Sequence, residues 1–335
     1  MAKSTVINDA EPKGKIFGMT LGNILGRFGA PLGLLFLILF LSVTSKVFLT
    51  GSNLSNIARQ ATVNAFLAIG LLMAIITAGI DLSVGSILAI SMCSMAIMAI
   101  KWDVNPYIAM LSCLVMGTLV GWFNGMLLTK LHLPHPFIAT LGTMNIARGL
   151  ALIITGASPI SGFDRAGASE ILFLGAGSIG PIPFSFVAVV IVYFIFHILL
   201  SNTSFGRHIY AVGGNTSAAR LSGINVSRTL VTVYSISGLM AGLAALMLSG
   251  RTNSGFPTAG AGYELDAIAA VIIGGASFSG GSGTISGTAI GVLMIAVLRN
   301  GLVLLNVPTE WQVVAIGLVI IGAVSIDVLR QTARS

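Results

Sequence analysis

Charged side chains are scarce in this sequence of 335 residues. Only 8% of the residues are charged, 55% are hydrophobic, and the mean hydropathy is +0.98. A soluble domain carries about a quarter charged residues, so the composition excludes a water-soluble globule. It also excludes a disordered chain, which would combine low hydrophobicity with high charge. The sequence therefore predicts a membrane protein.

Residues and motifs that carry chemistry are scarce as well. The two cysteines, Cys93 and Cys113, lie in apolar stretches and lack the spacing of a metal site or a disulfide framework, so we expect buried thiols. The sequence contains no Gly-Lys-Ser/Thr phosphate loop, no H-E-x-x-H metal motif and no G-x-S-x-G nucleophile motif. We accordingly assign no catalytic residue, no metal site and no bound cofactor, and any energy source is a gradient or another subunit. The net charge of +7 does not indicate nucleic acid, because cytoplasmic loops of membrane proteins are rich in Lys and Arg.

Long apolar runs cover most of the chain. A membrane-spanning helix needs about 20 mostly apolar residues, and these runs predict an all-α, polytopic transmembrane helix bundle of about ten spans. The eighth run is short and rich in glycine, so we interpret it as a partial or broken helix. The predicted spans are 28–47, 61–79, 83–100, 106–128, 137–155, 183–201, 229–249, 264–279, 284–304 and 311–328.

The distribution of Lys and Arg predicts the orientation of the bundle. With the amino terminus inside, ten of these residues fall on inner segments and six on outer segments, which favours both termini in the cytoplasm. The expected organisation is a cytoplasmic amino-terminal tail at 1–27, a transmembrane domain at 28–328 and a cytoplasmic carboxy-terminal tail at 329–335. The longest cytoplasmic loop within this domain is 202–228.

Glycine recurs at four-residue spacing within several predicted spans. Examples are Gly117, Gly121 and Gly125 in one span and Gly238 and Gly242 in another. In lipid, this spacing lets two helix backbones approach closely. It therefore predicts close helix packing in the bundle.

Several polar residues fall within the fifth predicted span. Arg148 lies at membrane depth, where an arginine costs roughly 2.5–3.5 kcal/mol by insertion scales and so requires a partner or a wet cavity. Asn145, Thr140 and Thr143 add polar groups to the same helix. Two interpretations remain open. The span lines a polar path, or Arg148 ties neighbouring helices together through carbonyls or a carboxylate.

Acidic residues flank two other predicted spans. Asp81 and Ser83 lie between the second and third spans, and either residue is suited to cap the third helix. Glu264 and Asp266 begin the eighth segment, where the helix dipole stabilises negative charge. The alternative for this acidic pair is a contact with a partner at the outer face.

The loop at 202–228 contains the start and stop signals of a short helix. Asn215 is a good N-cap, Gly223 is a good stop, and about two turns lie between them. A helix this short is marginal by itself in water, and its small residues would let another protein come close. The loop is therefore predicted either to be a partner site or to pack on its own bundle.

A set of short segments appears in a characteristic order: 53–57, 79–86, 136–144, 148–149, 205–207, 213–224, 264–270 and 279–284. Together they resemble the membrane permease subunits of bacterial ABC importers for monosaccharides of the ribose, galactose and xylose type. The resemblance covers roughly residues 50–330, and the stretch 156–164 looks most like galactose-type permeases. One departure is the pair His132 and His135, which replaces the usual Pro-Pro-type turn.

The resemblance implies a homodimer in the bacterial inner membrane, two cytoplasmic ATPase subunits that use ATP and Mg²⁺, and a periplasmic sugar-binding protein that meets outer segments near 156–182, 251–263 and 305–310. It implies that the loop 202–228 docks in the ATPase. The expected coupling residues are Gly213, Gly214, Asn215, Ala218, Ala219, Arg220, Gly223 and Ile224. The expected path residues are Asn64, Thr140, Thr143, Asn145 and Arg148, and Asp81, Ser83, Glu264 and Asp266 are expected to form structural or gating turns.

Two other classes of function compete with the importer hypothesis. A gradient-driven secondary transporter or channel for a small polar solute is suggested by Arg148 and the scattered carboxylates. The scarcity of acids within the spans weighs against it, since proton coupling uses chains of Asp, Glu and His. An intramembrane enzyme ranks last, because no nucleophile–base pair is recognisable.

Overall fold

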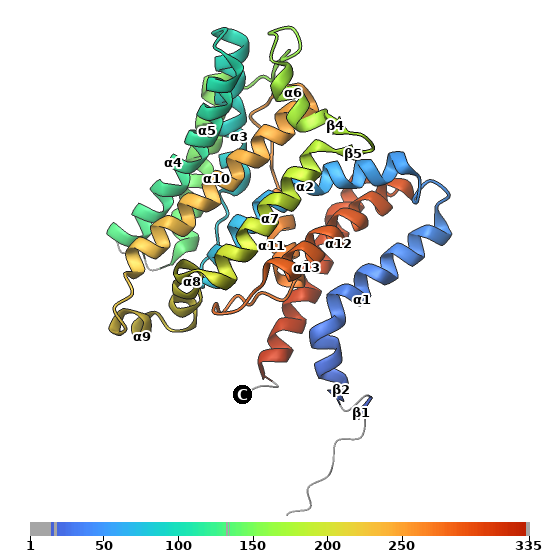
Figure 1. Cartoon of the computed structure of the whole chain (residues 1–335), viewed down its shortest axis with the longest axis vertical. Coiled ribbons are helices and arrows are strands. Elements are labelled where there is room, and N and C mark those ends of the chain that lie inside the picture. Colours follow the sequence, from blue (N-terminus) through green and yellow to red (C-terminus); the bar gives the residue numbers. More distant parts are fainter. Residues whose placement is uncertain (1–14, 17–18, 132, 134, 333–335) are drawn as a thin grey trace, which may run out of the picture.

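The structure, a computed structural model, describes residues 15–16, 19–131, 133 and 135–332 (Figure 1). Most of this chain is helical. Its α-helices are α1 (Leu21–Thr44), α2 (Gly51–Ile76), α3 (Val84–Ala96), α4 (Pro106–Lys130), α5 (Pro136–Thr155), α6 (Ser169–Ala176), α7 (Phe184–Asn202), α8 (Ser204–Gly214), α9 (Thr216–Leu221), α10 (Val226–Thr252), α11 (Tyr263–Ile273), α12 (Ile285–Leu304) and α13 (Thr309–Thr332). A π-helical turn, η1 (Ile97–Lys101), continues α3.

Short strands join some of the loops. Within the described residues they form three antiparallel pairs, each of two-residue strands: β1 (Lys15–Ile16) with β2 (Met19–Thr20), β3 (Ile160–Ser161) with β6 (Ser254–Gly255), and β4 (Ser178–Ile179) with β5 (Ile182–Pro183). The β3–β6 pair links the loop after α5 to the loop after α10. The strands are too short to change the predicted class of fold.

A helix lies at each of the ten predicted spans, and seven helices are long and apolar enough to cross a membrane. These seven are α2, α3 with η1, α4, α5, α7, α10 and α12. The apolar stretches Gly29–Thr44 of α1 and Thr309–Gly322 of α13 are shorter. The eleven residues of α11 rise only about 17 Å, against about 30 Å of bilayer hydrocarbon, as expected for a partial helix. The chain is a multi-pass membrane bundle.

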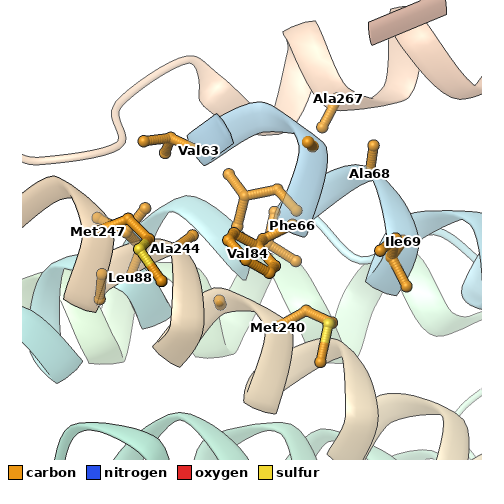
Figure 2. Close-up of a cluster of buried hydrophobic side chains, with 14 of the residues drawn as sticks. Val63, Phe66, Ala68, Ile69, Val84, Leu88, Met240, Ala244, Met247 and Ala267 are labelled. Atoms are coloured by element: carbon orange, nitrogen blue, oxygen red, sulfur yellow. The ribbon is translucent and has the colours of Figure 1, made fainter. Parts of the chain in front are cut away.

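The core lies where α2, α3, α10 and α11 meet (Figure 2). Phe66 of α2 is fully buried, beside Val84 and Leu88 of α3 and Met240 of α10. Cys93 and Cys113 are free and buried, as predicted. The carbonyl of Gly242 accepts the thiol of Cys113 at 3.4 Å.

The glycine spacing has the predicted role in packing. A Cβ added to Gly121 of α4 would meet the Tyr234 carbonyl and the backbone of Gly238 in α10, and one added to Gly117 would meet the backbone of Gly238 and Gly242. Glycine therefore permits backbone contact along the α4–α10 pair, which crosses the bundle together in Figure 1.

Several helix boundaries differ from the predicted ones. Helix α2 begins at Gly51, ten residues before the predicted apolar run, because Thr50 caps it and Asn53 is buried against α12. Helix α1 begins at Leu21, inside the predicted tail 1–27, and α13 continues to Thr332. The remainder of the predicted tails, residues 1–14, 17–18 and 333–335, lies outside the described residues.

Candidate functional site

The loop predicted at 202–228 folds as two short helices, α8 and α9. The Asn215 side chain caps α9 by accepting the Ala218 amide at 2.9 Å. Gly223 adopts φ +83°, which ends the helix, and its amide donates to the Arg220 carbonyl at 3.1 Å. The predicted start and stop of this helix are confirmed.

One face of α9 packs against the rest of the chain, and its other face is exposed. Ala219 is buried beside Val212 of α8 and Val226 of α10, and Ile224 packs on the same cluster. Leu221, by contrast, is 91% exposed. Leu221 is therefore the large apolar side chain on the open face of α9. The exposed residues beside it are Gly214, Asn215, Thr216, Ser217, Ala218, Arg220, Ser222 and Gly223.

Helix α8 connects this open surface to two interruptions in the bundle. We call the interruptions the helix-break junction: residues 77–83 between α2 and α3, and residues 274–284 between α11 and α12. The two breaks meet, because the Gly281 amide donates to the Ile76 carbonyl at 2.8 Å. A Cβ at Gly213 of α8 would overlap that same carbonyl, so α8 touches the end of α2 directly.

Tyr210 makes a second connection from α8 to the junction. Its hydroxyl donates to the Gly283 carbonyl at 2.7 Å, just before α12 begins. Sequence reasoning missed this residue. The signal for it was the helical spacing of Tyr210 and Gly213, which places both on the side of α8 that faces the junction. Helix α8 therefore contacts the end of α2 and the segment just before α12.

Asp81 lies inside the first break, fully buried, and ties three elements together. Its carboxylate accepts the Ser83 amide at 3.0 Å, the Ser83 hydroxyl at 2.5 Å and the Ser237 hydroxyl of α10 at 2.8 Å. The Asn124 amide of α4 donates to the Ser83 hydroxyl at 2.8 Å. Ser83 occupies the N-cap position of α3, as predicted, but its side chain makes no capping hydrogen bond. Both side chains instead satisfy each other and their neighbours in the buried interior.

Arg148 ties α5 to the loop before α11. Its guanidinium donates to the Pro257 carbonyl at 2.5 Å and to the Ala259 carbonyl at 2.7 Å. This is the second of the two interpretations left open by the sequence.

The other path candidates on α5 lie on two different faces. Thr140 and Thr143 are buried, and Thr140 donates to the Ile80 carbonyl at 3.2 Å in the first break. Asn145 is exposed and bonds the Leu141 carbonyl of its own helix at 2.9 Å. The structure therefore does not bring these three side chains to one surface. At the start of α5, His135 caps the helix by accepting the Phe137 amide at 3.2 Å, and His132 lies outside the described residues.

The acidic start of α11 is paired within the chain. The Arg299 guanidinium of α12 forms an ion pair with buried Asp266 at 2.6 Å, and Asn64 of α2 donates to the same carboxylate at 3.4 Å. Glu264 accepts the Gly262 amide at 3.2 Å. Asn64 and Asp266 were predicted for different roles but contact each other. The sequence did not identify Arg299 as the partner of Asp266, because the two residues are far apart along the chain.

The loops at the opposite end from α9 are ordered by contacts with one another. Besides the β3–β6 pair, the Asn253 amide donates to the Asp164 carboxylate at 2.7 Å. This hydrogen bond lowers the pKa of the Asp164 carboxyl from its usual value. The predicted outer segments near 156–182 and 251–263 therefore form a joined surface.

The described residues contain no group of three His, Cys, Asp or Glu side chains able to hold a metal ion. The main features of the candidate site are the exposed, capped helix α9, the contacts of α8 with the helix-break junction, and the buried polar groups that connect the helices.

Comparison with known proteins identifies the family. The family profile described as "Branched-chain amino acid transport system / permease component" matches residues 53–324, and the chain belongs to this family of transport permeases. The ribose import permease protein RbsC of Bacillus subtilis (strain 168) is 44% identical over 304 residues, 91% of this chain and 93% of that protein.

Other relatives are named for other sugars. The D-allose transport system permease protein AlsC of Escherichia coli (strain K12) is 41% identical over 86% of this chain and 87% of its own length. The galactose/methyl galactoside import permease protein MglC of the same strain is 37% identical over 90% of this chain and 94% of its own length. The local likeness of residues 156–164 to galactose-type permeases is thus not matched by higher identity over the whole chain. No solved structure matches the chain.

Proposed function

We propose that this chain is the permease subunit of an ATP-driven ABC importer and forms the transmembrane path for a ribose- or galactose-like monosaccharide. The support is membership of the permease family together with the sugar importers among its relatives, which align over about nine-tenths of the chain. In this proposal the subunit sits in the bacterial inner membrane with about ten membrane-crossing segments and both termini in the cytoplasm. A periplasmic binding protein delivers the sugar.

The chain acts as one of two identical permease copies beside two ATPase subunits. ATP and Mg²⁺ are used by the ATPase, and this chain binds no cofactor. Asn145 is the path candidate with an exposed side chain, so we place it on the surface where the second copy would complete the path. The joined loops that contain Asp164 and Asn253 are the proposed surface for the binding protein.

The observation that carries the coupling role is the exposure of Leu221 on a helix whose neighbour, α8, touches both sides of the helix-break junction. In this proposal the ATPase receives Leu221 in an apolar pocket, and its movement reaches α2 and α12 through Gly213 and Tyr210. Small residues around Leu221, such as Ala218 and Gly223, leave room for the approaching surface.

The first experiment is a tagged pull-down from detergent-solubilised membranes with mass identification of the recovered chains. We expect an ATPase subunit to co-purify with the unmodified chain and to be lost with Leu221→Asp, because an apolar pocket rejects a carboxylate. Leu221→Met is the matched control and should retain the ATPase. Recovery of the intact chain alone, with uptake that survives ATP depletion and collapses with an uncoupler, would replace the importer by a gradient-driven transporter.

A further inference from the structure

A cavity of about 400 Å³ opens where the end of α7, the start of α8 and the start of α12 come together. Thr284 of its lining belongs to the helix-break junction, and none of its lining residues lies on α9. The wall of the cavity is mostly apolar and includes several polar side chains. The lining includes His197, Ser201, Arg207, Tyr210, Thr284 and Ile285.

The charge in this cavity has no counterpart among the residues that the structure describes. The Arg207 side chain is exposed and has neither an ion pair nor a side-chain hydrogen bond within the residues that the structure describes. The sequence contains no Asp or Glu from 171 to 263, so no acidic residue follows or precedes Arg207 closely. His197 adds a second basic group to the same lining. A ligand that matches this cavity carries negative charge.

The first turn of α12 adds a further positive contribution. Thr284 caps this twenty-residue helix by accepting the Gly287 amide at 3.0 Å, and both Thr284 and Ile285 line the cavity. Amide groups at a helix N-terminus carry partial positive charge and favour phosphate oxygens. The start of α12 and the Arg207 guanidinium therefore both place positive charge at the lining of the same cavity.

The surface that leads to the cavity is apolar. Along α7, large hydrophobic side chains are exposed up to the turn that precedes Ser201, and they include Val190, Phe194 and Ile198. A free phosphate ion has no apolar part that could contact this surface. The acyl chains of a lipid can pack against it. The ligand is therefore expected to be amphiphilic, with an anionic head and apolar chains.

We propose that the cavity between α7, α8 and α12 binds the phosphate headgroup of an anionic phospholipid, with Arg207 and the start of α12 as the headgroup contacts. The acyl chains lie along the exposed face of α7. Basic pockets between transmembrane helices bind such headgroups. This site is separate from ATPase docking at α9, and Tyr210 borders both the lipid and the helix-break junction, which places the lipid beside the link from α8 to α12.

The test uses the purified full chain alone, so its result does not depend on the ATPase or on transport. The chain is reconstituted in nanodiscs of phosphatidylcholine with phosphatidylglycerol, extracted, and analysed by native mass spectrometry for retained lipid. We expect retained phosphatidylglycerol in excess over phosphatidylcholine. Arg207→Gln should lower the retained phosphatidylglycerol about five-fold, the effect of one basic residue near an anionic membrane surface. Arg220→Gln, which removes the same charge from exposed α9 outside the cavity, should leave it unchanged.

A second variant fills the cavity without removing charge. Ser201→Trp should exclude the lipid while Arg207 is still present, and an unchanged melting temperature would show that the fold is intact. Equal losses from Arg207→Gln and Arg220→Gln would assign the effect to general surface charge and overturn the site. Release of phosphatidylglycerol by inorganic phosphate would assign the cavity to a free phosphate and overturn the lipid. Equal retention of the neutral and the anionic lipid would do the same.

Discussion

Helices α2 and α7 are both apolar enough to cross a membrane, yet the bundle uses them in opposite ways. In the most apolar stretch of α2, 83% of the residues are buried, against 28% in α7. The more hydrophobic helix is α7, whose exposed face is apolar, while α2 carries Asn53, Thr62 and Asn64 into the interior. In lipid, apolar surface gives no preference for the protein interior, so small and polar residues decide which faces pack together.

The largest effect is expected where glycine sets the distance between two buried helix faces. Gly121→Leu places a side chain against the Tyr234 carbonyl and the backbone of Gly238, which cannot move without separating α4 from α10. We expect a loss of about 3 kcal/mol, seen as a lower melting temperature and a lower yield of folded protein. The measurement is a thermal unfolding curve of the purified chain in detergent.

Gly142→Leu is the matched control, because a Cβ at Gly142 meets nothing within 4 Å. It makes the same change on the exposed face of α5. Equal losses from the two variants would mean that close packing between α4 and α10 does not determine the effect, and would remove the distinction between the two kinds of helix face.

A smaller effect is expected from the buried carboxylate in the first helix break. Asp81→Leu leaves the hydroxyls of Ser83 and Ser237 without their acceptor in the interior. An unsatisfied buried donor costs about 2 kcal/mol, so the melting temperature should fall clearly. Asn145→Leu replaces a polar residue of the exposed face and should change stability by no more than about 0.5 kcal/mol. An unchanged melting temperature of Asp81→Leu would show that these hydrogen bonds do not stabilise the break between α2 and α3.

The smallest effect concerns one polar pair between α2 and α12. The Asn53 and Asn300 side chains exchange two hydrogen bonds, at 3.0 and 2.8 Å. A double-mutant cycle with Asn53→Ala and Asn300→Ala should give a coupling energy of about 0.6 kcal/mol, typical of hydrogen bonds between membrane helices. Additive losses would show that the two amides contribute independently to the stability of the α2–α12 contact.

The sequence by itself determined the features that depend on neighbours along the chain. Apolar runs placed the helices, because a helix satisfies its own backbone in lipid. The cap at Asn215, the stop at Gly223 and the partial eighth span were predictable for the same local reason. The glycine spacing identified Gly117 and Gly121 as packing positions, although it did not name the partner helix.

Only the tertiary structure decided which distant residues meet. Asp81 and Ser237 are 156 positions apart, and Asn53 and Asn300 are 247 apart. No local pattern encodes such pairs, which is why Asp81 was predicted to cap a helix and Arg299 had no predicted partner. The exposure of helix faces also depended on the tertiary structure, since α7 exposes large apolar side chains such as Phe194. In a membrane the chain sequence specifies helices, whereas the packing of their polar and small residues specifies which surfaces remain open to partners and lipid.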